Sequence, residues 1–216
     1  MAPFVPPLPS TGPPVRPGDC RVCGGATHGP FALCFCCTSL VGQLRMPLVP
    51  LVAAVDYRVH DGIHRRLRGY KDAFVAEQRR VYRQDLAGLI GPWMAYSGPG
   101  LQRRFGSGWD VVTTVPSSRR PAGSPVDAVI EEVPQLRALR RPLLVRGPCP
   151  TDHLVAGRKG FELARGVDPS WLRGRSVLVM DDSVTTGARA QSAAAALRIG
   201  GARVPGIVVI GRAVAA

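Results

Sequence analysis

Residues 177–189 read VLVMDDSVTTGAR and carry more structural information than any other stretch of the chain. Four apolar residues lead directly into two adjacent acids, Asp181 and Asp182, and a loop of small residues follows. A continuous apolar run is typical of a strand that is buried on both faces. Two carboxylates at the end of such a strand cost stability unless something pairs with them, so we expect a ligand at this point.

The loop SVTTG, residues 183–187, opens a helical segment. Its glycine, hydroxyls and backbone N–H groups can surround a phosphate, with help from the N-terminus of the helix. The neighbouring carboxylates can accept hydrogen bonds from vicinal hydroxyls, so the stretch as a whole fits a ribose 5-phosphate. A strand followed by a Thr-capped helix, with Asp182 as a turn residue, is the alternative, and it accounts for only one acid and one threonine.

Short apolar runs alternate with helical patterns along the chain from residue 51. Strands are expected at residues 51–55, 110–115, 143–145, 177–180 and 206–210. Helices are expected at residues 73–90 and 188–199, and from Ser124 and Pro125 through 127–133. This alternation predicts an α/β fold with a mainly parallel sheet covered by helices. In such a sheet, ligands bind beyond the carboxyl ends of the strands.

The helix expected at residues 73–90 has a broad apolar face. The residues on that face are Phe74, Val81, Leu86, Leu89 and Ile90. A loop broken by glycine and proline is expected to follow at residues 97–108.

Five of the six cysteines fall within CRVCGGATHGPFALCFCC, residues 20–37. Cys20 and Cys23 form one C-x-x-C pair, and Cys34 and Cys37 form a second. Two such pairs a short loop apart can place four thiolates around one tetrahedral Zn²⁺ ion. A segment this short cannot build its own core, so the metal would supply its folding energy and would be structural.

Other ligand sets remain open for this cysteine segment. Two disulfides are one alternative, and a cytosolic location argues against them. Cys36 and His28 are spare ligands, either of which could replace a thiolate. Cys149 lies far away between two prolines and is expected to be a lone thiol.

The composition suits one full domain and a small module, because 216 residues with 45% hydrophobic content can bury a sizeable core. The net charge is +13, and only Lys71 and Lys159 among the 28 basic residues are lysines. Arginine makes bidentate contacts with phosphate oxygens, which indicates a partner that carries phosphate. An arginine-rich surface that reflects a GC-biased coding sequence explains the charge equally well.

Three parts of the chain are expected. Residues 1–19 would form a disordered proline-rich tail, residues 20–45 the zinc module, and residues 46–216 the α/β domain. No continuous apolar run is long enough to span a bilayer, so no membrane partner is expected. The first residues lack the basic and apolar regions of a signal peptide, so we expect a cytoplasmic protein.

The stretch VLVMDDSVTTGA resembles the phosphoribosyl pyrophosphate (PRPP) motif of type I phosphoribosyltransferases, which joins an apolar strand, two acids and a Thr-Thr-Gly loop. With a four-cysteine module ahead of it, the chain resembles the ComF family of competence-associated, phosphoribosyltransferase-like proteins. The resemblance covers roughly residues 20 to 212. It implies a type I phosphoribosyltransferase-like fold, with Mg²⁺ accompanying PRPP and a structural Zn²⁺ ion. It leaves a homodimer open, because the superfamily often dimerises.

The resemblance also implies roles for individual residues. Asp181 and Asp182 would hold the ribose hydroxyls and act in catalysis. The 5-phosphate side of the ligand would lie against Ser183, Val184, Thr185, Thr186, Gly187, Ala188 and Arg189. The strand end VPSSRR would supply a pyrophosphate loop with Ser117, Ser118 and Arg119. The basic segment RRLRGYKD would place Arg68 and Lys71 near the active site.

The expected activity is transfer of a phosphoribosyl group to an unidentified nitrogenous base with release of pyrophosphate. A protein that binds PRPP or a nucleotide without turnover is one alternative. A factor in DNA uptake that works with competence proteins is another. Nucleic acid is not the favoured partner, because aromatic residues make up only 6% of the chain and no stacking platform is visible.

Overall fold

The computed structural model describes residues 18–27, 29–117 and 124–214. The tail expected at residues 1–19 falls almost entirely outside this range, as do His28, Ser118 and Arg119. Within the described ranges, no helix combines the length and the apolar character needed to cross a membrane.

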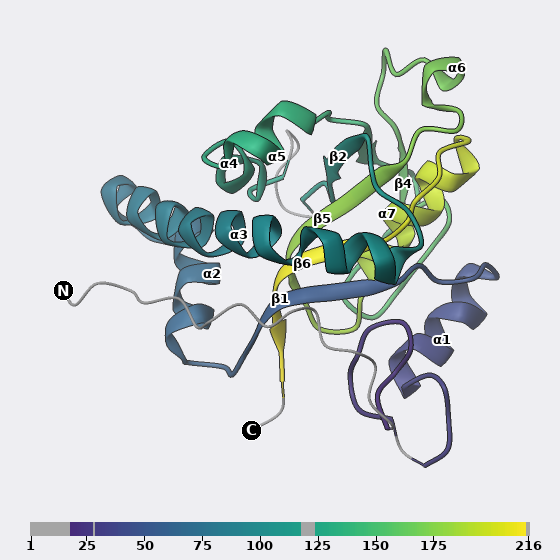
Figure 1. Cartoon of the computed structure of the whole chain (residues 1–216), viewed down its shortest axis with the longest axis horizontal. Coiled ribbons are helices and arrows are strands. Elements are labelled where there is room, and N and C mark those ends of the chain that lie inside the picture. Colours follow the sequence, from purple (N-terminus) through teal and green to yellow (C-terminus); the bar gives the residue numbers. More distant parts are fainter. Residues whose placement is uncertain (1–17, 28, 118–123, 215–216) are drawn as a thin grey trace.

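Four parallel strands form the main sheet in the order β1-β6-β5-β2 (Figure 1). Their bounds are Leu51–Tyr57 for β1, Val111–Thr114 for β2, Val177–Val184 for β5 and Ile207–Ala213 for β6. β5 has a neighbour on each side, and its first four residues are fully buried. The prediction of a parallel α/β sheet with residues 177–180 in an interior strand is therefore confirmed.

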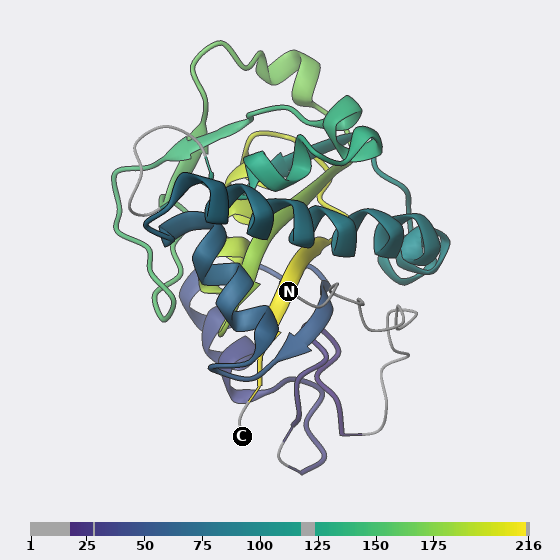
Figure 2. The same cartoon turned by 90° about the vertical axis from the view of Figure 1, so that its left-hand side faces the viewer.

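Helices cover both faces of this sheet (Figures 1 and 2). On one face Leu178 and Met180 share a core with four helices. These are α2 (Gly62–Asp72), α3 (Ala76–Phe105), α4 (Asp127–Ile130) and α5 (Pro134–Leu139). On the other face Val177 and Val179 share a second core with α7 and with a small two-stranded sheet.

The second face is built from short elements around one longer helix. They are β3 (Leu144–Arg146), β4 (Phe161–Leu163), α6 (Pro169–Leu172) and α7 (Ala188–Ile199). α7 has the bounds expected from its alanine-rich sequence and ends at Gly200. Successive side chains of β5 point to opposite faces of the sheet. Because helices cover both faces, every residue of the apolar run 177–180 is buried, and none of them is polar.

The long helix differs from its prediction at both ends. α3 begins at Ala76, so Phe74 lies before it and is 99% exposed, and its expected place on the apolar face was wrong. The loop expected at residues 97–108 was also wrong, because α3 continues to Phe105 through Pro92 and Pro99. Leu101 is 1% exposed and belongs to the core. This packing offsets the helix-breaking cost of the prolines.

Two shorter segments also differ from their predictions. The strand expected at residues 143–145 is β3, which pairs antiparallel with β4 outside the main sheet. β4 and α2 were not predicted. The helix expected from Ser124 through residue 133 contracts to α4 (Asp127–Ile130), and Ser124 makes no side-chain cap.

Candidate functional site

A cavity of about 590 Å³ opens at the carboxyl end of β5, where α2, the end of β2 and the start of α7 meet. Every predicted substrate-site residue that the structure describes lines it. These residues are Arg68, Lys71, Ser117, Asp181, Asp182, Ser183, Val184, Thr185, Thr186, Gly187, Ala188 and Arg189. Ser118 and Arg119 lie outside the described residues. Residues more than a hundred positions apart are therefore neighbours at one site.

The two acids point to opposite faces of β5. The strand runs on through both of them to Val184, so they are not turn residues. Because side chains alternate along a strand, Asp182 shares the face of Leu178 and Met180, which α2 covers. Asp181 shares the face of Val179, against which α7 packs.

Asp182 is held by two side chains of α2. Tyr70 donates its hydroxyl hydrogen to Oδ2 of Asp182 at 2.5 Å, and the Lys71 Nζ lies 2.5 Å from the same oxygen. Ser183 donates to Oδ1 at 3.1 Å. Burial alone would raise the pKa of Asp182, but Lys71 and these hydrogen bonds outweigh it and hold the pKa below its ordinary value. Asp182 therefore stays ionised near neutral pH.

Asp181 has the opposite tendency. Burial, followed by repulsion from the Asp182 carboxylate, raises the pKa of Asp181 to about 7. Positive charge on Arg189 and Lys71 opposes that rise. One Asp181 oxygen accepts the backbone N–H of Asp182 at 2.9 Å. The pair thus consists of one fixed anion and one group whose charge responds to pH and to cations near neutrality.

The connection between β5 and α7 forms a second wall of the cavity. Gly187 has φ 88° and is the N-cap residue of α7. A Cβ there would meet only ordinary contacts at 3.6 Å or more, so the positive φ is what favours glycine. The Thr186 hydroxyl accepts the Ala188 N–H at 3.2 Å and donates to the His153 carbonyl. The start of a 12-residue helix therefore faces the cavity with its positive dipole end.

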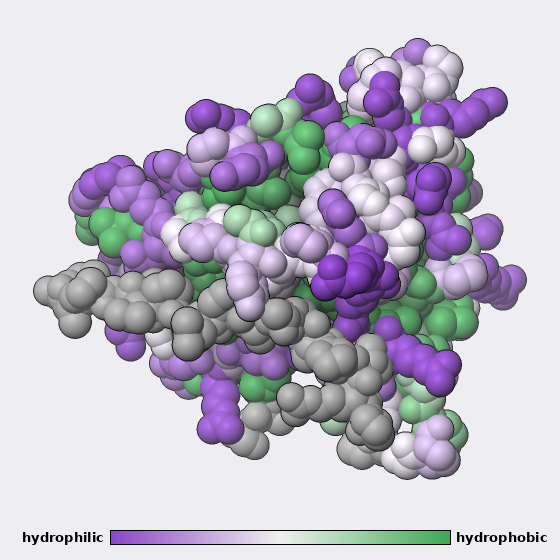
Figure 3. Space-filling view, in the orientation of Figure 1, coloured by the Kyte–Doolittle hydropathy of each residue, from purple (hydrophilic) through white to green (hydrophobic). Residues whose placement is uncertain are grey.

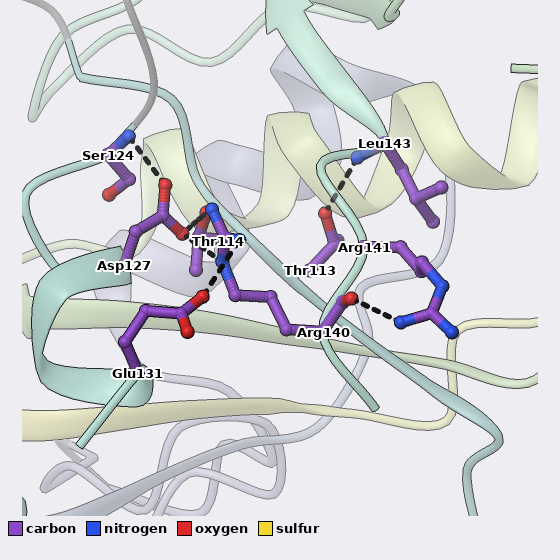
Figure 4. A network of polar contacts seen from close by, with 8 residues as sticks. All are labelled: Thr113, Thr114, Ser124, Asp127, Glu131, Arg140, Arg141 and Leu143. Carbon is purple, nitrogen blue, oxygen red and sulfur yellow. Dashed lines mark hydrogen bonds and ion pairs between the residues drawn. The ribbon is translucent and has the colours of Figure 1, made fainter. Parts of the chain in front are cut away.

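The end of β2 forms a third wall. Arg189 donates to the carbonyl of Pro116, which fixes the guanidinium between α7 and the segment leading to Ser117. Ser124, which follows residues 118–123 in the sequence, also lines the cavity. Its N–H donates to Asp127 Oδ2 at 3.1 Å (Figure 4).

Asp127 sits at the centre of the network in Figure 4. Its Oδ1 accepts the Thr114 hydroxyl at 2.8 Å and the Arg140 Nε at 2.9 Å. Arg140 also contacts Glu131 at 3.1 Å. The network ties the start of α4 to the last residue of β2, and so anchors both ends of the segment that carries Ser117 and Ser124.

Some residues in the cavity wall or behind it were not assigned from the sequence. Tyr70 is buried, with 6% of its surface exposed, and its hydroxyl holds Asp182. His153 lines the cavity, as do Asp72 and Ser124. His153 lies outside every regular element, so no periodicity indicates its place. For Tyr70, its position next to Lys71 in RRLRGYKD was the available signal.

The four cysteines lie close together in the way their spacing predicts. The sulfur atoms of Cys20, Cys23, Cys34 and Cys37 are all within 4.8 Å of one another. The Cys23 and Cys34 sulfurs are 3.7 Å apart, close to the separation of about 3.8 Å that tetrahedral Zn–S bonds of about 2.3 Å require. The donor set therefore fits a metal such as zinc.

The thiols of this cluster influence one another's ionisation. A hydrogen bond from Cys37 lowers the pKa of Cys23 to about 5 against the effect of burial, whereas burial raises the pKa of Cys34 to about 11. Cys36 is not part of the cluster, and Cys149 is exposed elsewhere.

One backbone hydrogen bond and one side-chain hydrogen bond join the cysteine segment to the main sheet. The Leu51 N–H at the start of β1 donates to the Val22 carbonyl at 2.8 Å. Arg212 in β6 donates to the Cys23 carbonyl at 2.6 Å and also pairs with Asp56 at 2.8 Å. The segment is thus attached to the edge strand β1 and to its neighbour β6.

No family model matches the chain, and no curated protein is similar to it.

Proposed function

We propose that the cavity binds PRPP with Mg²⁺ and that the protein transfers the phosphoribosyl group to a nitrogenous base. The observation that carries this proposal is the arrangement around β5. An acid pair and a Thr-Thr-Gly loop at a helix N-terminus share one cavity at the end of a buried parallel strand. The likeness of VLVMDDSVTTGA to the PRPP motif, and of the chain to the ComF family, supports the same assignment.

The two walls suit the two ends of a ribose 5-phosphate. The 5-phosphate lies at residues 185–188, where the dipole of α7 and backbone N–H groups favour an anion. The ribose hydroxyls donate to the carboxylates of Asp181 and Asp182. Each carboxylate has about four acceptor positions, so the hydrogen bonds that Asp182 already accepts leave room for a further donor.

The basic residues suit the pyrophosphate. Arg68 and Lys71 come from successive turns of α2 and line the cavity beside Ser117. Lys71 has three N–H donors, so it can pair with Asp182 and still donate to a phosphate oxygen. The Lys71 ammonium then contacts both Asp182, which holds the ribose, and the pyrophosphate, which is the leaving group.

The reaction forms one bond and breaks one. A nitrogen lone pair of the base attacks C1 of the ribose, and the electron pair of the C1–O bond leaves with pyrophosphate. Positive charge develops on the ribose, and the nearby carboxylates of Asp181 and Asp182 offset it. Mg²⁺, when bound, would neutralise charge on the pyrophosphate through oxygen ligands. The chain itself contributes mainly the positioning of the ligand.

Calorimetric titration of Mg–PRPP into the zinc-loaded full chain tests binding. We expect the wild type to give a binding heat that fits one site. The double variant with Asp181→Asn and Asp182→Asn should give no binding heat. Glu162→Gln is the control for removal of a carboxylate outside the cavity, because Glu162 is exposed on β4. No binding by a folded wild type would reject the proposal.

A second assay separates transfer from binding. Pyrophosphate release is measured while a panel of nitrogenous bases is offered to the PRPP-bound protein. Release that requires a base supports transfer. Binding without release under any base would identify a ligand-binding protein and reject the catalytic part.

A further inference from the structure

We propose that the four-cysteine module supports one wall of the ligand site, and that Gln43 is a positioning residue through which metal binding shapes the cavity. This goes beyond the phosphoribosyl assignment, although its ligand-binding test depends on that assignment. Four steps connect the cysteines to the cavity wall: a helix, a small core, a glutamine and a loop.

The first step is helix α1, Phe35–Leu44, which begins within the cysteine cluster. Cys34 is its N-cap residue, and Cys37 lies in its first turn. The helix cannot change its starting position or direction without moving two of the four sulfur atoms. Metal binding would therefore fix where α1 points, because tetrahedral coordination allows little variation in the ligand positions.

The second step is a small core that is separate from the two cores of the main sheet. Leu40 and Leu44 of α1 pack with Ala188 and Ala195 of α7, and Ala156 completes the cluster. Ala188 is the first residue of α7 and lines the cavity. α1 therefore lies against the start of the helix that the proposed phosphate loop opens.

The third step is the side chain of Gln43. Its Oε1 accepts the N–H of Ala156 at 2.6 Å, and its Nε2 lies 3.4 Å from the Leu154 carbonyl oxygen as donor. Ser39, one turn earlier on α1, accepts from the same Nε2 at 3.0 Å. The amide thus connects α1 to residues 154–156 at both of its polar ends.

The loop of residues 152–156, which Gln43 holds at Leu154 and Ala156, reaches the cavity at His153. His153 lines the cavity, and its carbonyl accepts the hydroxyl of Thr186, a residue of the proposed phosphate loop. Asp152 accepts the N–H groups of Leu154 and Val155 at 2.6 and 2.8 Å, so the segment is internally ordered. A shift of α1 is therefore transmitted through Gln43 to His153 and Thr186.

The loop has a second anchor that does not involve α1. Gly157 donates its N–H to Ser192 Oγ on α7 at 3.0 Å, and Ser192 is fully buried. This contact provides an internal control. Loss of Gln43 or of the metal is expected to loosen residues 153–156 and to leave the Gly157 anchor in place.

Hydrogen exchange of the zinc-loaded full chain is the first test. Gln43→Ala should raise the exchange rate of the Ala156 amide by up to about tenfold, because one hydrogen bond is lost. Gln43→Glu keeps the acceptor and should restore most of the protection. Gln78→Ala on α3, whose side chain contacts Tyr82 only locally, is the matched control. Unchanged exchange at Ala156 in Gln43→Ala would overturn the inference.

Metal removal and ligand titration complete the test. Chelation should raise Ala156 exchange at least as much as Gln43→Ala does, while Gly157 stays protected. The Kd of Mg–PRPP should weaken in Gln43→Ala, recover in Gln43→Glu and stay unchanged in Gln78→Ala. Equal Kd values in all variants would also reject the inference. If the wild type binds no PRPP, the proposed function fails, but the exchange result still decides whether metal and loop are coupled.

Discussion

Asp181 and Asp182 are adjacent in the sequence but have different main partners. Tyr70 and Lys71 contact Asp182 from α2. For Asp181, Arg189 is the cation that lowers the pKa most. The sequence indicated that two acids stand at one strand end. It did not indicate their different partners, because Tyr70 and Lys71 come from a helix that the sequence analysis had not predicted.

The raised pKa of Asp181 leads to a prediction about stability and pH. Its pKa is about 7 in the folded chain, above the ordinary value of 3.8. Between these values the unfolded chain loses the proton and the folded chain keeps it, so ionisation favours unfolding increasingly as pH rises from about 4 to 7. Asp181→Asn should therefore stabilise the fold at pH 8 relative to wild type and have little effect at pH 4.

Urea unfolding at several pH values measures this effect. The Glu162→Gln control should show no such trend, because Glu162 is exposed. A stability difference between Asp181→Asn and wild type that does not change with pH would contradict the raised pKa.

The hydroxyl of Tyr70 supports the Asp182 carboxylate. Tyr70→Phe keeps the ring in the core and removes the hydrogen bond to a buried anion. We expect a loss of about 1–3 kcal/mol in the free energy of unfolding at pH 7. Tyr96→Phe, on an exposed residue of α3, should change it by less than about 0.5 kcal/mol. Equal effects of the two substitutions would show that Asp182 does not depend on Tyr70.

At the scale of elements, the sequence predicted those helices and strands whose bounds depend on neighbouring residues in the chain. α7 was predicted closely, since an alanine-rich helix agrees with its surroundings, whereas β5 was predicted too short, because it continues past its apolar run through both acids to Val184. α3 was predicted too short because Pro92 and Pro99 break helices in isolation. Burial of Leu101 against the core overrides that preference, and no local pattern reveals such a contact.

The turn into α7 gives a prediction for a matched pair of glycines. Gly187→Ala places a side chain at φ 88° and should destabilise the fold by about 1–2 kcal/mol. Gly88→Ala lies inside α3, where an added Cβ meets nothing within 4 Å, and should stabilise the fold by about 0.5–1 kcal/mol. Thermal unfolding of both variants measures the difference. A Gly187→Ala variant as stable as wild type would contradict the described turn.

The cysteine cluster predicts one metal ion per chain. Elemental analysis should find about one equivalent of zinc, and Cys20→Ser or Cys37→Ser should lose it together with thermal stability. Cys36→Ser and Cys149→Ser should retain it, because these thiols lie outside the cluster. Full zinc content in Cys20→Ser would show that another ligand completes the site.

At the scale of the whole molecule, three parts converge on one cavity. The main sheet supplies the acids, α2 supplies the cations, and the cysteine module holds the loop that carries His153. The proximity of the module and the cavity could not be predicted from sequence. The contacts of Gln43 with Leu154 and Ala156 span more than a hundred residues.

The arginine-rich surface does not by itself identify a partner. Figure 3 shows hydrophilic and hydrophobic residues interspersed over the visible face. Several arginines in the described part of the chain are engaged in ion pairs, including Arg66 with Asp85 and Arg140 with Asp127. These pairs reduce the charge available to a nucleic acid, whereas the cations in the cavity face a confined space that suits a small phosphate ligand.

The central claim is that the acid pair and the Thr-Thr-Gly loop hold the two ends of one phosphoribosyl ligand. A crystal structure of the zinc-loaded chain with Mg–PRPP tests it most directly. The account predicts the 5-phosphate at residues 185–188 and the ribose hydroxyls within hydrogen-bonding distance of Asp181 and Asp182. Ligand density anywhere else, or a reversed ligand with its ribose away from both acids, would contradict it.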